Sequence, residues 1–139
     1  MNYRISFAFL LLVLAQTAHS IEEYFGKLWE VFAPARYLCS QVSKNHETGF
    51  LIINSALILF GLWCWWFPIR KNYSYARGLI WCWIIMESIN VIGHTAWAID
   101  ESAYRPGVAT VPLILLMVIC VGKQLPFPSN AASSNKVCD

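Results

Sequence analysis

The sequence predicts an all-α integral membrane protein, a bundle of four transmembrane helices. Two observations predict this fold class. Of the 139 residues, 58% are hydrophobic and only 13% are charged, whereas about 25% of the residues in a soluble domain are charged. The apolar residues also fall into four runs, and a helix needs about 17 to 25 such residues to cross a bilayer.

The four runs give the predicted spans, which cover residues 5–25, 49–67, 78–99 and 108–125. The last of them is short, and it reaches spanning length when Lys123 extends its side chain to the membrane surface. Residues 1–125 are therefore expected to form one transmembrane domain in contact with the lipid bilayer.

Two further segments are expected outside the spans. Residues 33–48 contain Pro34 and several charged side chains, which predicts a loop, with a short surface helix as an alternative. Residues 126–139 are rich in Ser and Asn and are expected to be a disordered tail. No acidic or basic run in the chain indicates nucleic-acid binding.

Positively charged residues at the span ends predict the orientation. With four spans both termini lie on one side of the membrane, together with Arg4, Arg70, Lys71, Arg77, Lys123 and Lys136, while the other side has Lys27, Arg36, Lys44 and Arg105. The side richer in Lys and Arg normally faces the cytoplasm. We therefore expect cytoplasmic N- and C-termini, with the protein in the plasma membrane.

Polar residues interrupt the apolar helices in two places. His19, Glu22 and Glu23 are spaced i, i+3, i+4 on the first helix, which puts them on one face. Glu87, Asn90 and His94 are spaced i, i+3, i+7 on the third helix and share a face as well (residues 87–94). A charged group at the centre of a bilayer costs about 2.5 to 3.5 kcal/mol on insertion scales, so such residues are functional candidates.

The two groups are expected at the same depth. Measured from a common membrane surface at about 1.5 Å per residue, His19 lies near ~22 Å and His94 near ~26 Å. Asn54 on the second helix and Thr110 at the start of the fourth fall in the same layer, while Glu87 lies deeper, near ~15 Å. One shared site between the helices is therefore predicted.

The residue types in this layer allow two kinds of chemistry. His19, Glu22, Glu23 and His94 are candidate metal ligands, because imidazole and carboxylate groups suit iron, zinc or manganese. The same groups without a metal would form an acid/base relay, with Glu87 and Asn90 as further members. Asn54 would help to orient the layer.

Structural roles are the alternative for each residue. Glu22 and Glu23 can form the hydrated end of the first helix, His94 can be a core histidine bonded to a carbonyl group, and Asn90 can hold helices together. The coincidence of six such residues at one depth favours a site.

These residues resemble the HXXEE family of small integral membrane proteins. The motif is His19-Ser20-Ile21-Glu22-Glu23, and the downstream segments Asn90 to His94 and Tyr104 to Thr110 resemble the family's N-x-x-x-H and Y-x-P-G-x-x-T patterns. The resemblance covers about residues 18–121 and implies a four-helix membrane protein that has these polar residues, Tyr104 and Thr110 included, in common with the family. It implies no particular reaction. A more distant likeness, in residue types alone, is to the emopamil-binding and sterol-isomerase group.

The resemblance also bears on the N-terminal run, which has the outline of a secretory signal, with Arg4 at its start and small residues at Ala18 and Ser20. Family members keep the His and Glu residues in the mature protein. We therefore expect the run to be retained as a helix.

Three functions remain open at this stage. The first is an enzyme acting on a lipid-soluble small molecule, by oxidation if a metal pair binds and by isomerisation or hydrolysis if it does not. The second is a small transporter or accessory subunit that binds protons or a cation and works as a homo-oligomer. The third is a scaffold in which the polar layer only holds the helices together.

Overall fold

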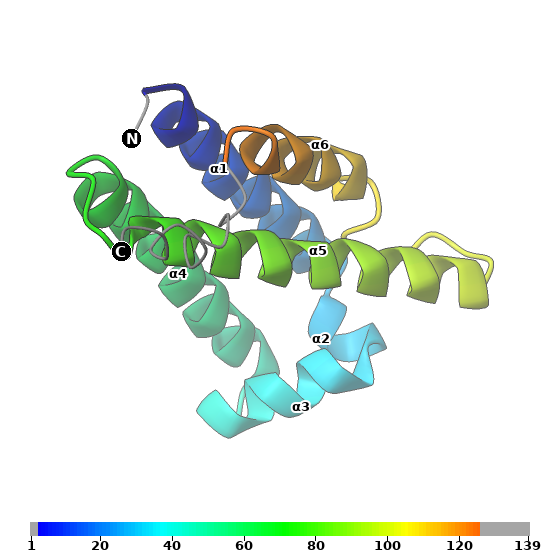
Figure 1. The fold of residues 1–139 in the computed structure, drawn as a ribbon. Coiled ribbons are helices and arrows are strands. Elements are labelled where there is room, and N and C mark those ends of the chain that lie inside the picture. The colour runs from blue at the N-terminus through cyan, green and yellow to red at the C-terminus, as the bar shows by residue number, and fades with distance from the viewer. Residues whose placement is uncertain (1–2, 126–139) are drawn as a thin grey trace, which may run out of the picture.

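The chain is all-helical in the computed structural model, which describes residues 3–125 (Figure 1). The helices are α1 (Tyr3–Phe25), α2 (Leu28–Val31), α3 (Ala33–Val42), α4 (His46–Cys64), the π-helix η1 (Trp65–Ile69), α5 (Ala76–Asp100) and α6 (Val111–Gly122). The predicted all-α class is confirmed. The predicted tail, 126–139, lies outside the described residues.

Three helical segments are long and apolar enough to cross a membrane: α1, the continuous segment His46–Ile69, and α5. Their bounds match the first three predicted spans to within a few residues. A membrane protein is therefore indicated by the length and composition of its helices.

The fourth helix is shorter than the predicted span 108–125. It has 12 residues, which cover about 18 Å of a hydrocarbon core about 30 Å thick. It begins only at Val111, and the backbone N–H groups of Ala109 and Thr110 just before it bond to the Glu22 side chain of α1. A fourth membrane crossing stays a prediction.

The segment expected as a loop, residues 33–48, is mostly helical. Helix α3 occupies ten of its residues and has Pro34 in its first turn, where the missing N–H is not needed. Asn45 then caps α4 by accepting a hydrogen bond from Thr48 N. The alternative of a short helix here was the correct one, and α3 packs against α4.

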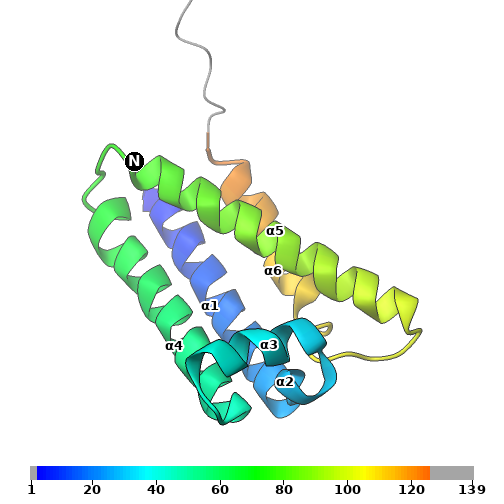
Figure 2. The ribbon, with the colours of Figure 1, turned by 90° about the horizontal axis from the view of Figure 1, so that it is seen from below.

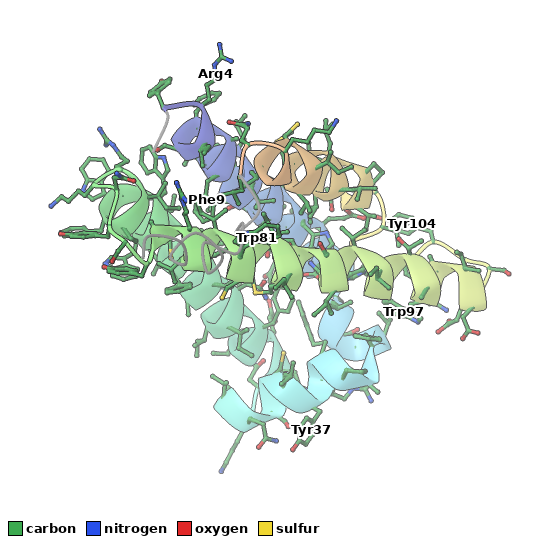
Figure 3. The ribbon with its side chains drawn as sticks, viewed as in Figure 1. Arg4, Phe9, Tyr37, Trp81, Trp97 and Tyr104 are labelled. Carbon is green, nitrogen blue, oxygen red and sulfur yellow. The ribbon has the colours of Figure 1, made fainter. Side chains whose placement is uncertain are left out.

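Helix α1 lies between α4 and α5, with α6 beside α1 and α5 (Figure 2). The core between these helices is apolar at the N-terminal end of α1, where Phe9 meets Trp83 edge to face at 5.8 Å between ring centroids. Figure 3 shows Phe9 on α1 and, far from it, Tyr104 in the connection between α5 and α6. Farther along α1 the buried side chains become polar, and this change from apolar to polar places the candidate site.

Candidate metal centre

Three buried side chains meet between α1 and α5. His19 is fully buried, and Glu23 and His94 are 6% and 7% exposed. One Glu23 oxygen, Oε1, lies 3.4 Å from His19 Nε2 and 3.1 Å from His94 Nε2. The two imidazole rings are nearly perpendicular, with centroids 4.8 Å apart. The expected proximity of His19 and His94 is therefore confirmed.

Local helix geometry explains this arrangement. His19 and Glu23 are one turn apart on α1, so their side chains lie one above the other on the same face. That face is turned toward α5, where His94 is buried. An i, i+4 pair on one helix and a single residue on its neighbour thus supply three potential ligands at one depth.

Thr110 fixes the orientation of His19. Its hydroxyl lies 2.7 Å from His19 Nδ1 and 2.7 Å from Glu22 Oε2. A hydroxyl has a single hydrogen, and the carboxylate of Glu22 is its strongest acceptor here. The hydroxyl therefore accepts a hydrogen bond from Nδ1–H of His19. In a neutral imidazole this leaves Nε2 of His19, which lies 3.4 Å from Glu23 Oε1, without a hydrogen.

Glu22 holds the connection between α5 and α6 rather than reaching the other ligands. Its Oε1 accepts hydrogen bonds from Tyr104 Oη at 2.5 Å, Gly107 N at 3.1 Å and Ala109 N at 2.9 Å. Its Oε2 accepts from the N–H and the hydroxyl of Thr110. Five donors and no acceptor surround the group, which matches an acceptor-only carboxylate.

Tyr104, outside the helices, responds to this contact. The hydrogen bond to the Glu22 carboxylate raises the pKa of the Tyr104 phenol, with partial burial and the nearby negative charge adding to the effect. The proton thus stays on the phenol, where it is needed for donation to Glu22.

Two glycines let this connection lie directly on the site. Gly107 has a φ of +96°, a conformation that side-chain-bearing residues rarely adopt, and a Cβ there would lie 2.6 Å from His94 Cε1 and 2.7 Å from His19 Cε1. At the end of α1, a Cβ on Gly26 would lie 2.5 Å from the Pro106 ring. Gly107 therefore lies against both imidazoles, and Pro106 lies against the end of α1.

The remaining predicted residues surround the triad without joining it. Glu87 is 1% exposed, and the amide nitrogen of Gln16, with its side chain in the orientation that satisfies both groups, donates to Glu87 Oε2 at 2.8 Å. Asn90 lines a cavity next to Glu23 and Glu87. Asn54 accepts a hydrogen bond from Ser20 at 2.8 Å and so ties α4 to α1.

The triad could hold a metal ion. His19, Glu23 and His94 each offer one ligand atom, all within 4.8 Å of one another, and neighbouring ligands of a tetrahedral zinc ion are about 3.3 Å apart when each bond is about 2.0 Å. Two histidines and one carboxylate are the ligand set of both catalytic zinc sites and non-haem iron(II) sites, which keep positions open for a reactant. The buried Nε2 of His19 has no hydrogen-bond partner among the described residues, as expected for a ligand atom.

One member of the surroundings was missed from the sequence. Gln16 continues the α1 face by the spacing i, i+3, i+7 with His19 and Glu23, a signal that was available. Gly107 was part of the Y-x-P-G-x-x-T pattern, but its close approach to two distant histidines gave no signal in the sequence.

The comparisons with known proteins give one family match. Residues 10–121 match the family described as "Protein of unknown function with HXXEE motif". No curated protein and no solved structure matches the chain. The match extends over most of α1, all of α4 and α5 and most of α6, and thus over every residue of the triad and its surroundings. The chain therefore belongs to the HXXEE family, and His19, Glu22 and Glu23 are the residues that give this motif its name.

Proposed function

We propose that this protein is a membrane-embedded metalloenzyme that acts on a lipid-soluble substrate. His19, Glu23 and His94 are the metal ligands. The observation that carries the proposal is the convergence of His19 Nε2, His94 Nε2 and Glu23 Oε1 in the buried interior, where Nε2 of His19 has no hydrogen-bond partner among the described residues.

Electrostatics supports a cation at this position. If Glu23 is ionised and Nε2 of His19 is an unprotonated acceptor, two electron-rich atoms face each other at 3.4 Å. A divalent cation between them relieves this repulsion and compensates a buried negative charge, whose cost would otherwise be high. When bound, such a metal supplies a Lewis acid that polarises a carbonyl or activates water.

The hydrogen bond at the other ring nitrogen, Nδ1, also supports His19 as a metal ligand. Metal-binding histidines usually donate their other N–H to an oxygen atom, which fixes the tautomer and the ring orientation. Here that oxygen is the Thr110 hydroxyl, which is itself bonded to Glu22. In this proposal Glu22 orients the site and holds the covering segment, rather than binding the metal.

A metal-free acid/base enzyme is the second candidate. It is favoured by the 3.1 Å contact between His94 and Glu23 and by the buried pair of Glu87 and Gln16. Both are arrangements through which a proton can pass to or from a bound substrate. In this case His19 and His94 would exchange protons with Glu23.

Metal analysis of the full chain, purified in detergent without added chelator, distinguishes the two candidates. We expect about one equivalent of zinc, iron or manganese in the parent protein and in His46→Ala, which changes the histidine at the start of α4, away from the site. His94→Ala and Glu23→Gln should lose the metal while remaining folded. A metal-free parent that also fails to bind added zinc, iron(II) or manganese(II) would leave the acid/base candidate.

The proposal includes the orientation in the plasma membrane, with both termini in the cytoplasm. At the η1 end, Arg70 packs over the rings of Trp65 and Trp66, and Lys71 packs over Phe67. Aromatic and basic side chains of this kind favour the membrane surface. The triad then lies nearer the opposite, outer surface of the membrane.

A further inference from the structure

We propose that the substrate is a lipid with an uncharged hydrogen-bond-donating head group, an alcohol, and that it reaches the metal centre sideways from the bilayer between α4 and α5. This inference rests on the proposed function, because it places the substrate next to the Glu23 ligand. It goes further in naming the substrate class and the route.

A cleft of about 310 Å³ lies between α4 and α5 with α1 as its floor. The floor contains Gln16 and Glu23, and Asn90 and Glu87 line it from the α5 side. Volumes of roughly 300 Å³ and above are typical of small-molecule sites. Because Glu23 belongs to both the cleft and the triad, a group bound in the cleft lies beside the proposed metal.

The mouth of the cleft faces lipid. Leu57, Met86 and Ile89 line it, and Ile89 and Met86 are 65% and 37% exposed on a helix that is long and apolar enough to span a membrane. All the lining residues belong to the spanning segments α1, α4 and α5. In Figures 1 and 2, α4 and α5 diverge away from the η1 connection. An apolar tail can therefore remain among the lipid chains while the head group sits at the floor.

The connection between α5 and α6 covers the triad on a side other than that of the cleft. The segment 104–110 is held over the end of α1 by the five hydrogen bonds to Glu22, and Gly107 lies against both imidazoles. Opening this side would break several charge-assisted hydrogen bonds. A substrate dissolved in the bilayer needs no such opening, and this difference favours lipid over water-soluble substrates.

The polar groups of the cleft select the head group. Two carboxyl groups, Glu23 and Glu87, line it together with the amides of Gln16, Asn54 and Asn90, and no Lys or Arg of residues 3–125 does. Asn54 is engaged with Ser20 and with Phe50 O, and Gln16 with Glu87. Acceptor oxygens are thus in excess over free donors, which suits a hydroxyl donor and disfavours anionic head groups such as carboxylate or phosphate.

Photo-crosslinking of the full chain in lipid nanodiscs tests the inference. The probes are hexadecanol and hexadecanoic acid, each with a diazirine near the head group, and labelled positions are located by mass spectrometry. We expect hexadecanol to label the segments around Leu57 and residues 86–90, and unlabelled hexadecanol to compete. The acid should label these segments no more than it labels the exposed residues Leu115 and Leu116 of α6.

Two variants make the result specific. Ile89→Trp adds bulk at an exposed position of the mouth, so it should fold normally and lose most of the cleft labelling. Glu87→Leu removes one acceptor and should reduce the preference for the alcohol about five-fold, as expected for one hydrogen bond. Equal labelling by both probes, or cleft labelling unchanged in Ile89→Trp, would overturn the inference.

Metal content measured on the same preparations separates this inference from the proposed function. If the metal is retained but labelling is spread evenly over the lipid-facing helices, the metal centre is supported and the proposal that the cleft binds an alcohol is wrong. If hexadecanol labels the cleft specifically in a protein that binds no metal, the alcohol-binding cleft is supported and the proposal of a metalloenzyme is wrong.

Discussion

The Thr110 hydroxyl lies 2.7 Å from Nδ1 of His19, and Nε2 of the same buried imidazole lies 3.4 Å from Glu23 Oε1. Thr110 precedes α6 by one residue, and His19 lies in the last third of α1. Thr110, at the start of α6, thus orients the ring of His19 near the end of α1, although the two residues are 91 positions apart in the chain.

Replacing Thr110 should weaken metal binding without removing a ligand. Thr110→Val keeps the shape of the side chain but removes the acceptor for Nδ1–H, and loss of such an outer contact typically costs about 10- to 100-fold in metal affinity. Thr110→Ser should restore most of the affinity because it restores the hydroxyl. Zinc titration of the chelator-treated protein measures both. Equal affinities in the valine variant and the parent would show that Thr110 has no part in orienting His19.

An alanine at position 107 should displace the covering segment. Gly107→Ala has to adopt a φ near +96° and to place a methyl group against both imidazoles, and we expect about 1 to 3 kcal/mol of destabilisation. Gly93→Ala is the matched control, since its Cβ meets no atom within 4 Å and lies in α5. There we expect no loss and a gain of up to about 1 kcal/mol. Thermal unfolding in detergent compares them, and similar curves for the two variants would contradict the close cover described here.

Glu22→Gln should loosen the same segment by a different route. The amide NH₂ group of glutamine would face N–H and O–H donors that now bond to a carboxylate. Hydrogen bonds to charged groups contribute about 1.5 to 3 kcal/mol, so we expect a destabilisation of about that size. Glu30→Gln, at an exposed position of α2, should leave stability nearly unchanged. Faster hydrogen exchange of the Ala109 and Thr110 amides in Glu22→Gln alone would locate the effect. Unchanged exchange there would mean that Glu22 does not hold the segment.

The titration of Tyr104 should report on the same carboxylate. Its pKa is raised, so the contribution of its neutral form to stability is complete below about pH 10, the ordinary pKa of tyrosine. That contribution is lost as the pH rises through the higher pKa of the folded state. The difference in phenolate absorbance between the parent and Tyr104→Phe gives the midpoint for this residue. The same difference measured in a Glu22→Gln background should shift to lower pH, and an unshifted midpoint would rule out the Tyr104–Glu22 hydrogen bond as its cause.

The fold was largely predictable because the composition and run lengths of a membrane helix are strong signals. Three spans came out within a few residues of α1, α4 with η1, and α5. The start of α6 was not predictable in this way, since Val108 to Thr110 are compatible with a helix by composition. The backbone N–H groups of Ala109 and Thr110 bond to the Glu22 side chain, and a contact between residues more than 80 positions apart leaves no periodic pattern in the sequence.

The candidate site was predictable in part, for a related reason. The spacing within α1 and within α5, together with equal depth in the bilayer, brought His19, Glu23 and His94 into one layer. Spacing could not distinguish Glu22 from Glu23, since both follow His19 by about one turn. Which of them turns toward α5 depends on the rotation of α1, and this rotation is set by its packing against α6 and α4.

Finally, we expect α1 to be retained in the mature protein. Cleavage near Ala18 would remove Phe9, Leu12 and Val13, which are completely buried in the core, and deleting even one such side chain typically costs about 2 to 5 kcal/mol. The seven residues of α1 that follow Ala18 could not by themselves hold His19 and Glu23 in helical register, because so short a helix is unstable. The intact mass of protein extracted from membranes through a C-terminal tag decides the matter. A mature chain starting between residues 19 and 21 would remove the packing on which the triad depends, and the metal centre would have to be abandoned with it.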